Sequence, residues 1–166
     1  IISQEKVQIR NDETVGELHD ILSQLGSKLL INTLPSIING TNKRIKQDES
    51  KVTLARIIKK EDEIIDFNER AENVYNKIRG LSPNPCAYAI LDKKRVKIYK
   101  ARIEKDSSGI EPGTIIDVNN GIKVKTQTDS VVIEELKFEG KKTMSVKDFL
   151  NGIKKQELLN KKFEKE

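Results

Sequence analysis

Two β-rich runs flank a turn in the stretch Thr114-Ile115-Ile116-Asp117-Val118-Asn119-Asn120-Gly121-Ile122-Lys123-Val124-Lys125-Thr126. Within it, Asn120-Gly121 is a strong signal for a two-residue hairpin turn, because both residue types tolerate positive φ angles. The runs 114–118 and 122–126 are therefore predicted to be neighbouring antiparallel strands.

Three further β-rich runs lie outward from this hairpin, at residues 87–91, 95–103 and 131–138. Turn residues such as Pro112-Gly113 and Glu139-Gly140 separate them. Five short strands at this spacing predict a small antiparallel β-barrel.

Helices are predicted on both sides of the strands. Asp66 or Asn68 can cap a helix that ends at Gly80. Capping-box spacing predicts a second helix over 145–151, and the lysine-rich residues 153–166 are predicted to be a charged tail, either a frayed helix or disordered.

The first forty residues are predicted to be helical. Thr14 and Glu17 have the spacing of a capping box, and helical periodicity continues to Gly26, where a first helix should end. Ser27 can cap a second helix that ends at Asn39. Forty residues cannot bury this much apolar surface alone, so they need either the second half of the chain or, as we favour, a domain missing from it.

Residues 41–67 are polar and charged, with few periodic apolar positions, which is typical of a connector that crosses a surface. The sequence thus divides into residues 1–40, a linker over 41–67, a β domain over 68–152 and the tail 153–166.

The composition is that of a soluble globular protein, with 36% hydrophobic and 34% charged residues. No apolar run reaches the roughly 18 residues that span a bilayer, and the first residues lack the pattern of a signal peptide. We therefore expect a cytoplasmic location and no membrane partner.

The positive charge is unevenly distributed. Residues 1–80 contain 13 Lys and Arg against 13 Asp and Glu, whereas residues 81–166 contain 18 against 13, so the whole net charge of +5 lies in the second half. This asymmetry indicates contact with a polyanion, although a lysine-rich solvated surface would give the same count.

A cationic strand face is the best candidate site. In the run 95–103, Val96 and Ile98 should point inward while the alternate residues point outward, and Lys123 and Lys125 should do so on the hairpin. The predicted phosphate-binding residues are Arg95, Lys97, Lys123, Lys125, Lys141 and Lys142. The alternative is a solubilising alternation on an antiparallel sheet.

No catalytic, cofactor-binding or metal-binding constellation is visible. The one histidine, His19, falls on the polar side of a predicted helix, which is typical of a surface residue. The one cysteine, Cys86, has no partner for a disulfide or a zinc site and is interpreted as a buried or half-buried thiol.

Several runs together resemble one family. They include Thr14-Val15-Gly16-Glu17-Leu18-His19-Asp20, Gln47-Asp48-Glu49-Ser50, Ile78-Arg79-Gly80-Leu81-Ser82-Pro83-Asn84-Pro85, and Gly140-Lys141-Lys142-Thr143-Met144-Ser145 followed by Asp148-Phe149-Leu150-Asn151-Gly152. In this order and at these intervals the chain resembles methionyl-tRNA formyltransferase.

The resemblance implies an α+β fold in three parts. Residues 1–40 would be the helical end of a Rossmann-like catalytic domain, residues 41–67 its linker, and residues 68–152 an OB-like antiparallel barrel with flanking helices that binds tRNA. The missing amino-terminal domain would be a partner of this chain.

The resemblance also implies an activity. Such enzymes transfer a formyl group from 10-formyltetrahydrofolate to the methionine amino group of initiator tRNA. The family's catalytic Asn, His and Asp match no position here, so the chain is expected to be inactive by itself and to dock the acceptor arm of initiator methionyl-tRNA. The alternatives are a buttress domain without tRNA contact, and part of a folate-dependent formyltransferase that acts on a sugar amine.

Overall fold

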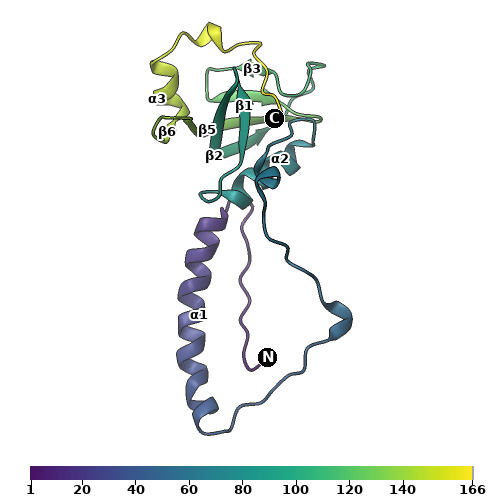
Figure 1. Ribbon diagram of the computed structural model, residues 1–166, viewed down its shortest axis with the longest axis vertical. Coiled ribbons are helices and arrows are strands. Elements are labelled where there is room, and N and C mark those ends of the chain that lie inside the picture. The colour runs from purple at the N-terminus through teal and green to yellow at the C-terminus, as the bar shows by residue number, and fades with distance from the viewer. Residues whose placement is uncertain (166) are drawn as a thin grey trace. The chain divides into compact units, whose positions relative to one another are not determined.

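The computed structural model describes residues 1–165, which fall into two compact units divided between Ile57 and Ile58 (Figure 1). The first unit is built on one helix, α1 (Val15–Ile38). A short 3₁₀ helix, η1 (Glu49–Lys51), interrupts the otherwise irregular segment after it. Within residues 1–165, no helix combines the length and the apolar character that crossing a bilayer would require.

The predicted capping box of α1 is confirmed. The hydroxyl of Thr14 accepts a hydrogen bond from the backbone N–H of Glu17, whose carboxylate accepts one from the backbone N–H of Thr14. The predicted break at Gly26 is wrong, because the helix runs on to Ile38, with Asn39 as its C-cap. Ser27 does not cap a new helix there: its hydroxyl donates to the carbonyl of Ser23 one turn earlier, at 2.8 Å.

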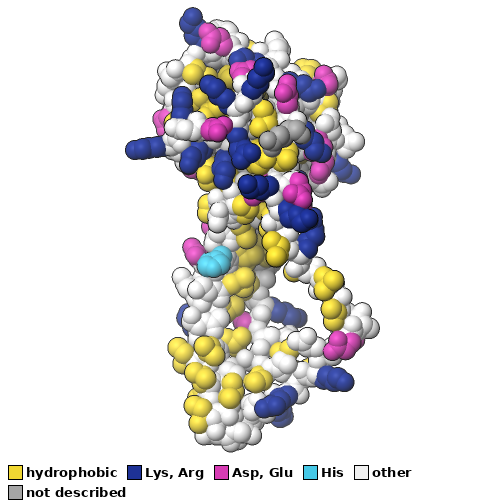
Figure 2. Space-filling model, in the orientation of Figure 1, with side chains coloured by type: hydrophobic (Ala, Val, Ile, Leu, Met, Phe, Trp, Pro, Cys, Tyr) yellow, Lys and Arg dark blue, Asp and Glu magenta, His cyan; other side chains and the backbone are white. Residues whose placement is uncertain are grey.

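Apolar side chains of α1 are largely exposed. No residue of the helix is buried, and Ile31 and Ile38 are 67% and 78% exposed. Figure 2 shows hydrophobic side chains at the surface of this unit. Since a helix gains most of its stability from packing an apolar face, α1 by itself lacks the contacts that its sequence is suited to make.

The second unit is α+β and contains a curled, six-stranded antiparallel sheet (Figure 1). The strands run in the order β1-β2-β5-β4-β3, and β6 pairs with β5. Their bounds are β1 Tyr88–Leu91, β2 Lys94–Glu104, β3 Ile115–Asp117, β4 Ile122–Lys125, β5 Ser130–Phe138 and β6 Met144–Ser145. All five predicted strands are confirmed, whereas β6, with two residues, was too short to be found by alternation.

The β3–β4 hairpin depends on Gly121. Its φ angle is +122°, and a Cβ atom there would lie 2.5 Å from Cγ1 of Val132 and 2.8 Å from the carbonyl oxygen of Ile133. Only glycine allows β5 to approach so closely. The predicted hairpin is present, but the predicted two-residue turn is wrong, because the four residues 118–121 connect the strands and Asn120 does not have a positive φ angle. Gly121 is required here by the close approach of β5.

Two helices flank the sheet. Helix α2 (Ala71–Leu81) buries Ala71, Val74, Ile78 and Leu81 in the core and contacts β2 and β5. The prediction that Asp66 or Asn68 caps it is wrong, since its N-cap is Arg70 and Asp66 instead bonds Asn68 and Lys165. Helix α3 (Val146–Asn151) begins at Ser145, as predicted, and packs on β5 and β6.

The segment expected to be a linker over 41–67 is divided by the structure. Residues from Ile58 onward belong to the second unit, where the 3₁₀ helix η2 (Lys60–Glu63) precedes Ile64, which forms a parallel bridge with Tyr88. Ile65 and Phe67 are buried in the core. The last ten residues of this segment thus help to build the β unit.

The C-terminal segment connects the two edges of the sheet. After the 3₁₀ helix η3 (Lys155–Glu157), Glu164 forms a bridge with Ile90 of β1, and Lys162 forms one with Thr114 beside β3. Between them, Phe163 is 3% exposed and its N–H donates to the carbonyl of Gly113 at 2.8 Å. The prediction of a frayed or disordered tail is therefore wrong, because backbone pairing and one buried aromatic ring hold the segment in place.

Candidate nucleic-acid interface

Strand β2 separates apolar from cationic side chains as the sequence predicts. Val96 and Ile98 are fully buried in the core, while Arg95 is exposed and Lys97 half-buried on the other face. The antiparallel register places Lys97 directly opposite Lys137 of β5. Like charges in directly opposed positions are destabilising, and an anion or a carboxylate beside them would offset this repulsion.

No carboxylate in the described residues offsets this pair. The ammonium of Lys97 donates to the carbonyl of Pro85 at 2.9 Å, which leaves its charge in place. Within residues 1–165, neither Lys97 nor Lys137 has an acidic side chain within ion-pair distance. The two lysines therefore keep an uncompensated positive charge at the surface of the sheet.

Arg95 and the turn after β5 extend this positive region. The guanidinium of Arg95 lies 4.1 Å from the centre of the Tyr88 ring, a cation–π contact that holds it over the sheet. The backbone N–H of Glu139 donates to the carbonyl of Arg95, so the turn that carries Lys141 and Lys142 starts beside it. Together these residues form what we call the basic surface: Arg95, Lys97, Lys137, Lys141 and Lys142.

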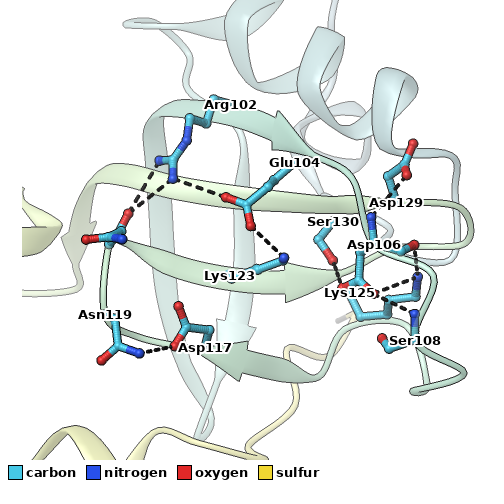
Figure 3. Close-up of polar contacts among 11 residues, drawn as sticks. Arg102, Glu104, Asp106, Ser108, Asp117, Asn119, Lys123, Lys125, Asp129 and Ser130 are labelled. Carbon is cyan, nitrogen blue, oxygen red and sulfur yellow. Dashed lines mark hydrogen bonds and ion pairs between the residues drawn. The ribbon is translucent and has the colours of Figure 1, made fainter.

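Lys123 lies outside the basic surface, and Figure 3 shows it beside Glu104, which also bonds Arg102. Its ammonium donates to Glu104 at 2.6 Å, and Arg102 bridges Glu104 and Glu134 at 3.3 and 2.9 Å. The hydrogen bond from Lys123 is the main reason why the pKa of Glu104 is lowered. Two cations and two carboxylates thus neutralise one another here.

Lys125 is buried, so the prediction that it points outward to solvent is wrong. Only 4% of the residue is exposed, and its ammonium donates to the carbonyls of Thr128 and Asp106 at 2.7 and 3.1 Å. It also lies 3.8 Å from a carboxylate oxygen of Asp106 (Figure 3). The loops that follow β2 and β4 cover the end of β4 where Lys125 lies. Alternation along a strand cannot predict such a contact.

Asp106 is held as a carboxylate by its neighbours. Burial by itself would raise its pKa, but hydrogen bonds from the Ser130 hydroxyl and the Ser108 backbone, together with the charge of Lys125, lower the pKa to about 2. The aspartate and Lys125 therefore form a structural pair that ties two loops to the sheet.

This pair predicts an acid-sensitive contribution to stability. The folded pKa of about 2 lies below the ordinary value of 3.8, so Asp106 stabilises the fold above pH about 4 and the contribution, on the order of 2 kcal/mol, is lost as pH falls toward 2. Urea unfolding at pH 6, 4 and 3 should show a smaller acid-induced loss in Asp106→Asn than in the unsubstituted chain. The control is Asp117→Asn, the same substitution at a half-buried aspartate of β3. Equal pH dependence of stability in the two variants would contradict the assignment.

Aromatic side chains offer no platform for unstacked bases. The chain has three Tyr, four Phe and no Trp, and each of the seven is buried or half-buried. Proteins that hold single strands stack successive bases on exposed aromatic rings. The basic surface is therefore suited to phosphate groups rather than to bases.

The two residues considered for chemistry are placed as expected. His19 is on the surface of α1 with 79% of its side chain exposed, 3.5 Å from Asp20. Cys86 is fully buried, and burial raises the pKa of its thiol to about 11. At neutral pH it is a protonated thiol next to the carbonyl of Ile98, without the thiolate that nucleophilic chemistry requires.

Comparison with known proteins identifies the family. Residues 57–154 match the family model described as the C-terminal domain of formyl transferases. Methionyl-tRNA formyltransferase of Staphylococcus epidermidis is 44% identical over 155 residues, which are 92% of this chain and 50% of that protein. The enzyme of Staphylococcus aureus is 42% identical over 154 residues, again 50% of its length. The chain thus spans about half the length of these relatives.

Solved structures share the fold at low sequence identity. A variant of HypX from Aquifex aeolicus matches with a TM-score of 0.66 and 16% identity, over 89% of this chain and 27% of that one. An N-formyltransferase from Helicobacter canadensis matches with a TM-score of 0.59 and 19% identity, over 80% and 48%. The resemblance found in the sequence motifs is confirmed, and the chain belongs to the formyl transferase family, whose C-terminal domain it contains.

Proposed function

We propose that the chain is part of a methionyl-tRNA formyltransferase and that its second unit binds the initiator tRNA. The whole enzyme would transfer the formyl group of 10-formyltetrahydrofolate to the methionine amino group on that tRNA, in the cytoplasm. Similarity to the two staphylococcal enzymes supports the activity. The opposed lysines Lys97 and Lys137, without a carboxylate partner in residues 1–165, carry the proposal that the surface meets a polyanion.

The proposed contacts differ from the set expected from the sequence. Arg95, Lys97, Lys141 and Lys142 remain, and Lys137 joins them because of the register between β2 and β5. Lys123 and Lys125 are left out, because Lys123 pairs with the carboxylate of Glu104 and Lys125 is buried beside the carboxylate of Asp106. Contacts of this kind are made to phosphate oxygens, so they position the tRNA without reading its sequence.

No chemical step is assigned to this chain. His19 is a solvated residue beside one aspartate, and Cys86 is a buried, protonated thiol. We assign formyl transfer, and the binding of the folate cosubstrate, to the part of the relatives that this chain does not span. In the same proposal α1 is the end of the Rossmann-like catalytic domain, where exposed residues such as Ile31 and Ile38 would find apolar partners.

Lys137→Glu tests tRNA binding without endangering the fold. The change turns the like-charge pair with Lys97 into an opposite-charge pair, so the melting temperature should stay the same or rise. Affinity for an initiator tRNA transcript should fall at least about tenfold, and the slope of log K against log salt should decrease by about one or more. Filter binding of the full chain at several salt concentrations measures both quantities.

The control is Lys105→Glu, which makes the same charge change just after the far end of β2, at a side chain that is 90% exposed and pairs with Asp129 at 3.1 Å. Because this pair is lost, the melting temperature of the variant is measured as well. It should retain affinity to within about threefold, since long-range attraction is screened over roughly 10 Å at 0.1 M salt. Equal affinity of Lys137→Glu and the unsubstituted chain would overturn the proposal and favour a buttress role for the second unit.

A further inference from the structure

The turn between β1 and β2 adopts a backbone conformation that its residues disfavour. Asp92 and Lys93 form a two-residue hairpin turn, with φ angles of +50° and +63°. Such turns strongly prefer Asn-Gly or Asp-Gly, because a Cβ atom is strained at positive φ. Asp is among the residues that tolerate it, whereas a lysine at the second position is unusual.

Asp92 has a structural reason to be in the turn, but Lys93 does not. The carboxylate of Asp92 pairs with the ammonium of Lys161, which fixes the turn to the C-terminal segment. The side chain of Lys93 is exposed, and within residues 1–165 it makes no hydrogen bond or ion pair. Strain of this kind persists where something else requires the residue, and it gathers at ligand-binding positions.

The turn continues the basic surface. Lys93 is two residues before Arg95, and the register pairs Leu91 with Lys94 and Ile90 with Arg95. Because successive side chains of a strand alternate, Lys94 and Arg95 extend from opposite faces of the hairpin, with Lys93 at its end. All three cations are exposed, so the tip is positively charged on both faces and at its end.

We propose that Lys93 is a phosphate-binding residue next to the basic surface, and that the strained turn is retained because it places a lysine at the tip of the hairpin. The inference rests on the proposed binding of tRNA and adds a contact outside the basic surface. Backbone phosphate is the ligand that fits, since the tip has three cations and the unit exposes no aromatic ring for a base. The pair between Asp92 and Lys161 holds the tip in position.

Lys93→Asn separates a binding residue from a structural one. Asparagine tolerates positive φ, so the melting temperature should stay the same or rise by up to about 5 °C. Affinity for the initiator tRNA transcript should fall about five- to tenfold at 0.1 M salt, with a decrease of about one in the salt slope. Lys93→Arg keeps the cation and should retain affinity to within about twofold, with no gain in melting temperature.

Lys105→Asn is the control, because it removes the same charge from an exposed residue just after the other end of β2, where the ammonium is already paired with Asp129. Unchanged affinity of Lys93→Asn, with a loss in Lys137→Glu, would overturn this inference and leave the proposed function standing. Unchanged affinity in both variants would overturn both. A lower melting temperature in Lys93→Asn would also overturn the inference, since it would show that the lysine stabilises the turn.

Discussion

Phe163→Ala is expected to lower the free energy of unfolding of the second unit by about 3–4 kcal/mol, the usual cost of truncating a buried phenylalanine. The ring is 3% exposed and packs against Phe67, with ring centres 5.4 Å apart. Its segment also supplies the backbone hydrogen bonds that connect β1 to the residues before β3. Loss of the ring should therefore release the edges of the sheet from each other.

Tyrosine fluorescence during urea unfolding measures this effect in one unit alone. The chain has three Tyr and no Trp, and the tyrosines, Tyr75, Tyr88 and Tyr99, all lie after Ile58. Ile110→Ala, at a side chain that is 44% exposed, should change stability by less than about 1 kcal/mol. A loss of less than about 1 kcal/mol in Phe163→Ala would contradict the role of this segment in closing the sheet.

The second large effect is expected at Lys125. Lys125→Met keeps the length of the side chain but leaves the buried carboxylate of Asp106 without its cation, and the carbonyls of Thr128 and Asp106 without a donor. Breaking a buried ion pair from one side costs about 3–5 kcal/mol, and the remaining bonds to Asp106 from Ser130 and Ser108 place the expected loss at about 3 kcal/mol.

Lys123→Met is the matched control on the same strand. Its partner Glu104 has 44% of its side chain exposed and remains paired with Arg102, so the loss should be about 1 kcal/mol or less. The same urea titration compares the two variants. Equal losses would show that Lys125 contributes no more to stability than its half-buried neighbour Lys123, and would return it to the candidates for tRNA contact.

The strands of the second unit were predictable because their signals are local. Alternation along β2 predicted that Val96 and Ile98 are inward, and Asn120-Gly121 marked the β3–β4 hairpin. The capping pair Thr14 and Glu17 marked the start of α1 for the same reason, since both partners of each hydrogen bond lie within one turn. Motifs in this order were also sufficient to indicate the family.

Two of the errors share a physical cause, which is contact between residues far apart in sequence. Lys125 was expected outside because alternation cannot show that two loops cover its end of β4. The lysine-rich C-terminal residues were expected to be a frayed helix or disordered, because only pairing with the two open edges of the sheet holds that segment in place. The error at Ser27 has a local cause. Its hydroxyl bonds the Ser23 carbonyl, which comes within reach only when residues 23–27 are already helical.

The sequence by itself determined the strands, the excess of positive charge after residue 80 and the family of the chain, because each depends on residue type and near neighbours. Only the tertiary structure decided which cations are available to a ligand. Strand register placed Lys97 opposite Lys137, and neither lysine has a carboxylate within ion-pair distance in the described part of the chain. The folding of the loops placed the carboxylate of Asp106 beside Lys125. Charge is a property of the residue, but its neutralisation depends on which residues the fold brings within a few ångströms.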